Sequence, residues 1–230
     1  MPIPVSMVGV ILGLVLASPA FAAPDTEIPS CLVAREYITS LEYLRGREES
    51  PLVDQTARPI AEKISSGCTG AAARFIRVDK ILVRAGLTLK DALDLAIQFA
   101  PKSDAETDAF ITVFTHAFSE NSLDLDLPQS IAMAKSLSLD FQGDHAVARE
   151  DFAQVLDYCL SGGDFDKMRP TCGVLAARIA GKGQRFDGGV GWPFVKSVQF
   201  LRSENQGPGL NLSDALTLSE ELIGHGPLAV

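Results

Sequence analysis

Apolar residues recur at three- and four-residue steps in four segments that begin at Phe75, Phe110, Phe152 and Phe194. This spacing places the apolar side chains on one face of a helix with 3.6 residues per turn. Each segment leads into a stretch that contains Ser, Gly or Asn, which is typical of loops. The pattern therefore predicts an all-α fold.

A short sequence motif, called the phrase below, recurs after these segments. The stretch GLTLKDALDLA at Gly86–Ala96 matches GLNLSDALTLS at Gly209–Ser219 at seven of eleven positions. A third copy runs from Leu125 to Ala134 and a degenerate one from Met168 to Ala177. The aromatic residues Phe110, Phe152 and Phe194 are 42 residues apart, as are Ser119, Ser161 and Ser203. Such self-similarity at a fixed period indicates tandem repeats, here of two helices each.

The repeated phrase has the composition of a helix start. With Thr88 as the N-cap, Asp91 falls at the third helical position, which predicts a capping box. The pairs Asp126 with Gln129 and Asn211 with Asp214 repeat this arrangement. The phrase therefore encodes architecture and need not encode chemistry.

These observations predict tandem helical hairpins of about 42 residues within one domain, residues 23–230. The expected hairpins span approximately 31–71, 75–100, 110–139, 152–180 and 194–224, the first being the most divergent. The repeat length falls in the range of HEAT-like solenoids, a similarity of period only. A short solenoid and a compact bundle both satisfy the pattern.

The N-terminus predicts export. An apolar run from Met7 to Val15 is followed by Ala20-Phe21-Ala22, a small-x-small triplet typical of signal peptide cleavage after residue 22. The run is shorter than the ~20 apolar residues that a membrane-spanning helix needs. We expect a bacterial protein that is periplasmic or secreted, with no stable membrane insertion once residues 1–22 are removed.

The cysteines support this compartment. Four are present, Cys31, Cys68, Cys159 and Cys172, and an even number in an exported chain indicates disulfides. Three pairings are possible, and we favour the local pairs Cys31–Cys68 and Cys159–Cys172. No CxxC motif or neighbouring histidine pair supports a metal site.

Charge and motifs narrow the function classes. A net charge of −9 disfavours nucleic acid as a partner, because nucleic acid binding depends on Lys and Arg. Basic proteins stay open as partners. No common catalytic or cofactor motif is present, and we predict no catalytic residues, metal or cofactor. The pairs Asp124/Asp126 and Asp164/Asp166 have the character of cap or turn residues. We place His145 in an acidic loop, Asp140 to Asp151, and interpret the run Arg45, Arg47, Glu48 and Glu49 as a solvated charge cluster.

The most unusual stretch runs from Gly181 to Gly189. Its glycines and basic residues admit an anion cradle, but a flexible connector is the simpler interpretation. It carries Arg185 and Phe186 and leads to Trp192, the only tryptophan. Because Trp and Arg are enriched in interface hot spots, these three are our candidate partner-binding residues. The alternative is that Trp192 packs into the core at the start of the next helix.

The resulting hypothesis is an exported, non-enzymatic protein that binds another protein in the cell envelope or serves as a scaffold. An immunity or inhibitor protein against a secreted effector is a narrower version of it. An enzyme that acts on cell-envelope polymers and a carrier of a small apolar ligand are the alternatives from other classes.

Overall fold

The computed structural model describes residues 34–47, 50–162, 169–183 and 189–225. Over these ranges the chain forms ten α-helices and one short 3-10 helix, with no strand. The predicted all-α fold is confirmed. The predicted signal peptide lies outside the described residues.

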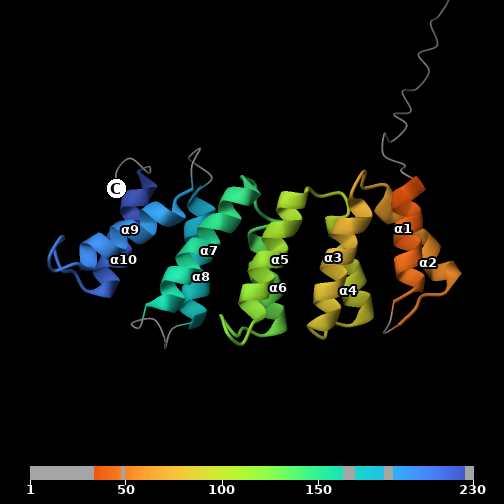
Figure 1. Cartoon of the computed structure of the whole chain (residues 1–230), viewed down its shortest axis with the longest axis horizontal. Helices are drawn as coiled ribbons and strands as arrows, with labels where there is room; N and C mark the ends of the chain where they lie inside the picture. The colour runs from red at the N-terminus through yellow and green to blue at the C-terminus, as the bar shows by residue number, and fades with distance from the viewer. Residues whose placement is uncertain (1–33, 48–49, 163–168, 184–188, 226–230) are drawn as a thin grey trace, which may run out of the picture. The chain divides into compact units, whose positions relative to one another are not determined.

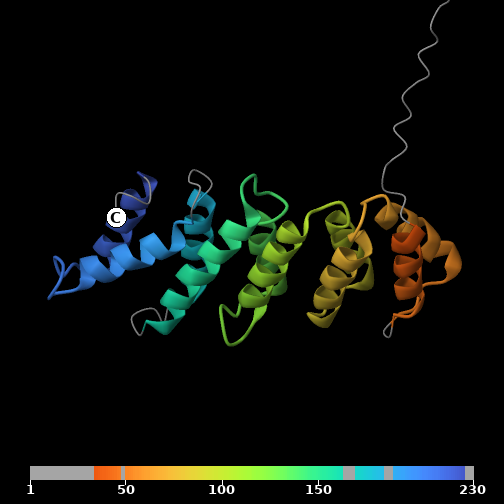
Figure 2. The ribbon, with the colours of Figure 1, turned by 45° about the horizontal axis from the view of Figure 1, so that its top comes forward.

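The helices follow one another as five antiparallel pairs (Figures 1 and 2). Their bounds are α1 Ala34–Arg45, α2 Asp54–Ser65, α3 Ala71–Arg84, α4 Leu89–Ala96 with the 3-10 helix η1 Ile97–Phe99, α5 Asp104–Phe118, α6 Leu127–Ser136, α7 His145–Ser161, α8 Arg169–Lys182, α9 Gly191–Arg202 and α10 Leu212–Gly224. The two helices of each pair contact each other, and contacts also join α1 with α3, α3 with α5, α5 with α7 and α7 with α9. Each hairpin thus packs on its neighbour in the sequence.

The repeated positions form the core. All four phenylalanines of the 3.6-residue pattern, Phe75, Phe110, Phe152 and Phe194, are fully buried. The small residues of the phrase are buried as well, because helices approach closely there. At Gly173 in α8, an added Cβ would lie 2.5 Å from a methyl carbon of Leu123, in the loop before α6. At this position of the phrase a larger side chain has no room.

The phrase begins helices as predicted, although the full capping box does not form. The side chains of Thr88, Asp126 and Asn211 accept hydrogen bonds from the amides of Asp91, Gln129 and Asp214. The third-position side chains do not return a bond to the N-cap amide. Asp91 and Asp214 instead accept from the N-cap side chains, at 2.6 and 2.7 Å. Aspartate is one methylene shorter than the glutamate that closes such a box.

A complete capping box occurs where the pattern gave no prediction. The hydroxyl of Ser103 accepts from the amide of Glu106, and the Glu106 carboxylate accepts from the amide of Ser103 at 2.7 Å. This device starts α5 six residues before Phe110. The first helices of these hairpins therefore begin before the phenylalanine that marks them, and in α5 the first turn is polar.

The residue before the first leucine of the phrase has positive φ. Its φ is +89° at Gly86, +52° at Asp124 and +66° at Gly209. The next residue, a leucine each time, donates its amide back to the end of the preceding helix; the Leu125 amide lies 2.8 Å from the Ala117 carbonyl oxygen. The leading glycine is thus required by the turn, and Asp124 occupies the same position under strain.

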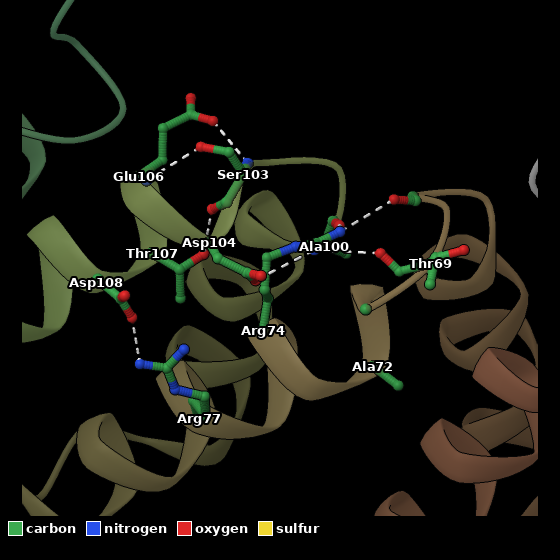
Figure 3. Close-up of polar contacts among 12 residues, drawn as sticks. Thr69, Ala72, Arg74, Arg77, Ala100, Ser103, Asp104, Glu106, Thr107 and Asp108 are labelled. Atoms are coloured by element: carbon green, nitrogen blue, oxygen red, sulfur yellow. Dashed lines mark hydrogen bonds and ion pairs between the residues drawn. The ribbon is translucent and has the colours of Figure 1, made fainter. Parts of the chain in front are cut away.

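Buried charges join the N-terminal hairpins through the backbone. Glu36 of α1 accepts from the amides of Gly70 and Ala72 at 3.1 and 2.8 Å, where α3 begins. Arg74 of α3 donates to the carbonyl oxygen of Ala100 at 2.9 Å, just before α5 (Figure 3). It also reaches the carbonyl oxygen of Gly67, after α2, at 3.3 Å. Each charge satisfies backbone groups that a helix end leaves without partners.

The disulfide between Cys159 of α7 and Cys172 of α8 is confirmed, with a Cα–Cα distance of 5.8 Å. It is one bridge among the described residues, where two were predicted for the chain. Cys31 lies outside the described residues, so its pairing with Cys68 stays a prediction. No helix in the described ranges is both long and apolar enough to span a bilayer.

The strain at Asp124 gives a stability prediction. Asp124→Gly should raise the free energy of unfolding by about 0.5–1 kcal/mol, because glycine adopts positive φ without a steric penalty. Gly86→Ala at the equivalent position should lower it by a similar amount. Urea unfolding of both variants measures the two effects; a destabilised Asp124→Gly variant would contradict the assignment of strain.

Loss of the disulfide should also be measurable. Cys159 and Cys172 are 13 residues apart, and a closed loop of this size stabilises a fold by about 3 kcal/mol. In a Cys159→Ala/Cys172→Ala variant, we expect amide hydrogen exchange to accelerate first in α7 and α8. Uniform acceleration across all helices would contradict a local role for the bridge.

Candidate functional site: the groove between α9 and α10

Helix α9 exposes an unusual apolar stripe. Trp192 and Phe200 are each 54% exposed, and Lys196 lies between them, one helical turn from each. The Lys196 ammonium lies 4.5 Å from the centre of the Trp192 ring, a cation–π contact. The opposite face of α9, which carries Phe194, is buried. The helix is therefore apolar on two faces, and only one of them serves the core.

A groove of about 580 Å³ adjoins this stripe. Its walls come from α9, α10 and the loop between them: Lys196, Ser197, Gln199, Phe200, Leu201, Gln206 and Leu222. The volume is within the ~300–1,000 Å³ range of ligand pockets. Apolar walls with two amide side chains and one cation suit a segment that is itself mostly apolar.

The two walls are fixed to each other by local contacts. Ser219 of α10 donates to the hydroxyl oxygen of Ser197 in α9 at 3.0 Å, in a buried position. The Leu210 amide donates to the Leu201 carbonyl oxygen at 2.8 Å. Gly207 lies so close to the backbone of Phe200 that no Cβ would fit. The groove is thus formed by packed backbone and does not depend on a ligand.

Salt bridges join α8 to α10. Glu220 accepts from Arg178 at 2.8 Å and from Lys182 at 2.8 Å. The Lys182 ammonium also lies 3.5 Å from the Glu220 carbonyl oxygen. Two cations from the last turns of α8 thus contact α10 at a single residue.

The start of α9 is fixed by a buried carboxylate. Asp151 of α7, 1% exposed, accepts from the amides of Val190 at 3.0 Å and Gly191 at 2.7 Å, immediately before Trp192. Burial raises the pKa of Asp151, while these two hydrogen bonds act in the opposite direction. The predicted acidic loop from Asp140 to Asp151 is wrong in its second half, because α7 begins at His145, capped by the side chain of Asp144.

Glycines in and just after the unusual stretch also lie against this carboxylate. A Cβ at Gly183 or Gly189 would lie 2.6 or 2.4 Å from an Asp151 oxygen, and one at Gly191 would lie 2.7 Å from its Cα. The described part of the stretch is therefore a packing element, and its interpretation as a flexible connector does not hold there. The carboxyl group beside these glycines belongs to the protein itself.

The exposure of Phe200 is exceptional within the repeat. Phe200 lies six residues after Phe194, and the equivalent residues Ile81 and Tyr158 are half-buried against the core. The third equivalent, His116, lies with its ring 6.4 Å from that of Phe152 in the next hairpin. In these earlier hairpins this position is thus partly buried, in one case against the following hairpin. At Phe200 the same position is exposed beside the groove.

Some of the other candidate residues lie outside the described ranges, and the structure gives a position for the rest. Arg185 and Phe186 lie outside the described residues, as do Asp164 and Asp166. Trp192 is exposed, so the alternative that it packs into the core is wrong. Asp126 is the N-cap of α6.

The predicted solvated charge cluster is wrong for one of its members. Arg47 is buried against Asp79. Arg45 forms an exposed ion pair with Asp54 at 2.6 Å, whereas Glu48 and Glu49 lie outside the described residues.

Sequence reasoning missed Lys196, Phe200 and the groove. The sequence does show part of the exposed stripe, because Trp192, Lys196 and Phe200 recur every four residues. This series is out of phase with Phe194 and Val198, which belong to the core face. The described residues contain no group of three or more His, Cys, Asp or Glu side chains placed to hold a metal ion. No protein-family model, curated protein or solved structure matches this chain.

The raised pKa of Asp151 predicts a pH effect on the helix that carries Trp192. The folded protein binds this proton more tightly than the unfolded chain does, for which the ordinary pKa is 3.8. The free energy of unfolding should therefore fall as the pH rises from 3.8 to the folded pKa, by about 1.4 kcal/mol for each pH unit between these two values. Above the folded pKa the effect is constant.

Asp151→Asn, which cannot ionise, should lack this component. Urea unfolding followed by Trp192 fluorescence, for both proteins from below pH 3.8 to neutral pH, isolates it as a difference. The stability of the wild type relative to the variant should be greater at the acidic end. A difference that does not change with pH would contradict the assignment.

Proposed function

We propose that this is an exported helical-repeat protein that binds a helical segment of another protein in the groove between α9 and α10. The observation that carries the proposal is the exposure of Phe200, at a repeat position whose other residues are partly buried, one of them, His116, beside the next hairpin. Such a surface is shaped for an apolar helix face. Exposed aromatic residues at helical spacing are typical of helix-in-groove recognition and of interface hot spots.

The residues that line the groove indicate which chemical groups the bound segment should carry. Lys196 is the cation among the lining residues, so the bound segment should carry a carboxylate beside its apolar residues. A second copy of this chain is a poorer occupant, because each copy carries a net charge of −9 and like charges oppose association. We therefore assign the groove to a different protein, in the periplasm or outside the cell.

The arrangement of hairpins supports an extended binding protein. Contacts run from each hairpin to the next in sequence, as in solenoids, where each repeat contacts its neighbours. We propose a short solenoid whose function is binding or scaffolding and not catalysis.

Truncation of the stripe tests the binding surface. Trp192→Ala and Phe200→Ala should each weaken partner binding by about fivefold or more, since such residues contribute over ~1 kcal/mol at hot spots. Because both are exposed, the free energy of unfolding should change by less than about 0.5 kcal/mol. Ile38→Ala, which removes a similarly exposed residue of α1, is the matched control and should bind normally.

Photocrosslinking supplies the partner for that measurement. A benzophenone amino acid at position 200 should crosslink to one discrete protein in the cells that make this chain, and the same group at position 38 should not. The crosslink at position 200 should disappear in the Trp192→Ala background. Equal crosslinking from both positions, or a product that contains only this chain, would overturn the proposal.

A further inference from the structure

A basic residue of α3 makes an ion pair with the hairpin that follows. Arg77, two residues after the phenylalanine of α3, pairs with Asp108, which lies two residues before Phe110 in α5 (Figure 3). Lys196 occupies the same position of α9, two residues after Phe194. In the other first helices this position carries an uncharged residue, which is Thr39, Thr112 or Gln154. Lys196 is thus the counterpart of a cation that contacts the next hairpin.

A second position of the first helices contacts the aromatic residue of the next hairpin. In α1 the aromatic residue of the repeat is Tyr37, and Tyr43 lies six positions after it. The ring of Tyr43 meets that of Phe75 edge to face, with the ring centres 5.9 Å apart. His116, at the same position of α5, lies 6.4 Å from the ring of Phe152. At both boundaries the residue at this position therefore lies beside the next aromatic residue.

Helix α9 presents both of these positions at the groove. Phe200 lies six residues after Phe194 and is 54% exposed, and Lys196 lies on the same stripe. Both residues line the groove. The ammonium of Lys196 lies over the ring of Trp192, so this side chain extends toward the start of α9. The two contacts that other hairpins make to the next one are thus available to a partner.

We propose that the segment bound in the groove is a helix with an acidic residue two positions before an aromatic residue, the spacing of Asp108 and Phe110 in α5. The carboxylate then pairs with Lys196, and the aromatic ring contacts Phe200. This inference rests on the proposed function and specifies the sequence of the partner. The ion pair contributes mainly to orientation and choice of partner, whereas the aromatic contact contributes to affinity.

The first hairpin of a second copy does not carry this pattern. Two residues before Tyr37 lies Arg35, an exposed cation of α1. A copy docked in the register of the repeat would place Arg35 against Lys196, and like charges oppose association. The pattern therefore favours a different protein over an end-to-end assembly of this chain.

A labelled peptide with the sequence of α5, Asp104–Phe118, is the probe, and fluorescence anisotropy with the full chain measures its binding. Lys196→Glu should weaken binding by about fivefold, because the ion pair becomes a repulsion. An Asp108→Lys peptide should show the opposite preference and bind the Lys196→Glu variant more tightly than the wild type. Lys90→Glu changes the net charge equally at an exposed site in α4, so it controls for long-range attraction.

Two further peptides test the aromatic half of the pattern. A Phe110→Ala peptide should bind the wild type about fivefold more weakly or worse, as expected for the loss of a hot-spot ring. Its affinity should fall little further on the Phe200→Ala variant, because the contact is already absent. A peptide in which Ala109 and Phe110 exchange places has the same composition but turns the ring by about 100° around the helix. It should bind as weakly as the Phe110→Ala peptide.

The inference is overturned if the α5 peptide does not bind, if the Asp108→Lys peptide binds the wild type equally well, or if the exchanged peptide keeps full affinity. The crosslink from position 200 separates this result from the proposed function. The crosslinked segment of the partner should contain an acidic residue two positions before an aromatic one. A single partner without this pattern would overturn the inference alone, whereas the absence of any crosslinked partner would overturn the proposed function as well.

Discussion

The fold depends on charged side chains that leave one hairpin and bind the backbone where the next hairpin begins. Glu36, Arg74 and Asp151 occupy the same repeat position, immediately before the aromatic residue of their helices. The two carboxylates accept from amides at the start of α3 and α9, and the arginine donates to carbonyl oxygens ahead of α5. A carboxylate lies where backbone amides need an acceptor, and a guanidinium lies where carbonyl oxygens need a donor.

This constraint explains why the charges are tolerated in the core. An ionised group without partners is expensive to bury, whereas one that satisfies two or three backbone groups offsets that cost. The fifth helix has Ala109 at this position, so its hairpin lacks the buried contact. There, Asp108 instead bridges Arg77 and Arg149, in half-exposed ion pairs of the kind that contribute little stability.

The same arrangement connects the fold to the proposed binding surface. Asp151 fixes the first residues of α9, and Trp192 follows directly. The glycines around Asp151 leave room for its carboxylate at the end of α8, from which Lys182 reaches α10. One buried acid thus lies beside the chain segments that position both walls of the groove.

Local features of the structure could be predicted from the sequence, but contacts over long sequence distances could not. Thr88 and Asn211 cap helices through residues three positions away, so their spacing alone identifies them. Arg47 and Asp79 are 32 residues apart, and their pairing appears only when α1 and α3 are packed in register. A run of mixed charges gives no sign that one member turns inward, which is why the sequence alone places Arg47 in solvent.

The groove shows why repeats reveal surfaces that single helices conceal. By itself, the α9 sequence contains two apolar stripes, and nothing in it says which one is covered. The comparison with Ile81, His116 and Tyr158 helps, because these equivalents of Phe200 are partly buried and the His116 ring lies beside that of Phe152 in the next hairpin. Phe200 places a large apolar side chain at that position and is half exposed. A position that is partly buried in the earlier hairpins and carries an exposed phenylalanine in α9 is where the proposed partner would gain the most burial.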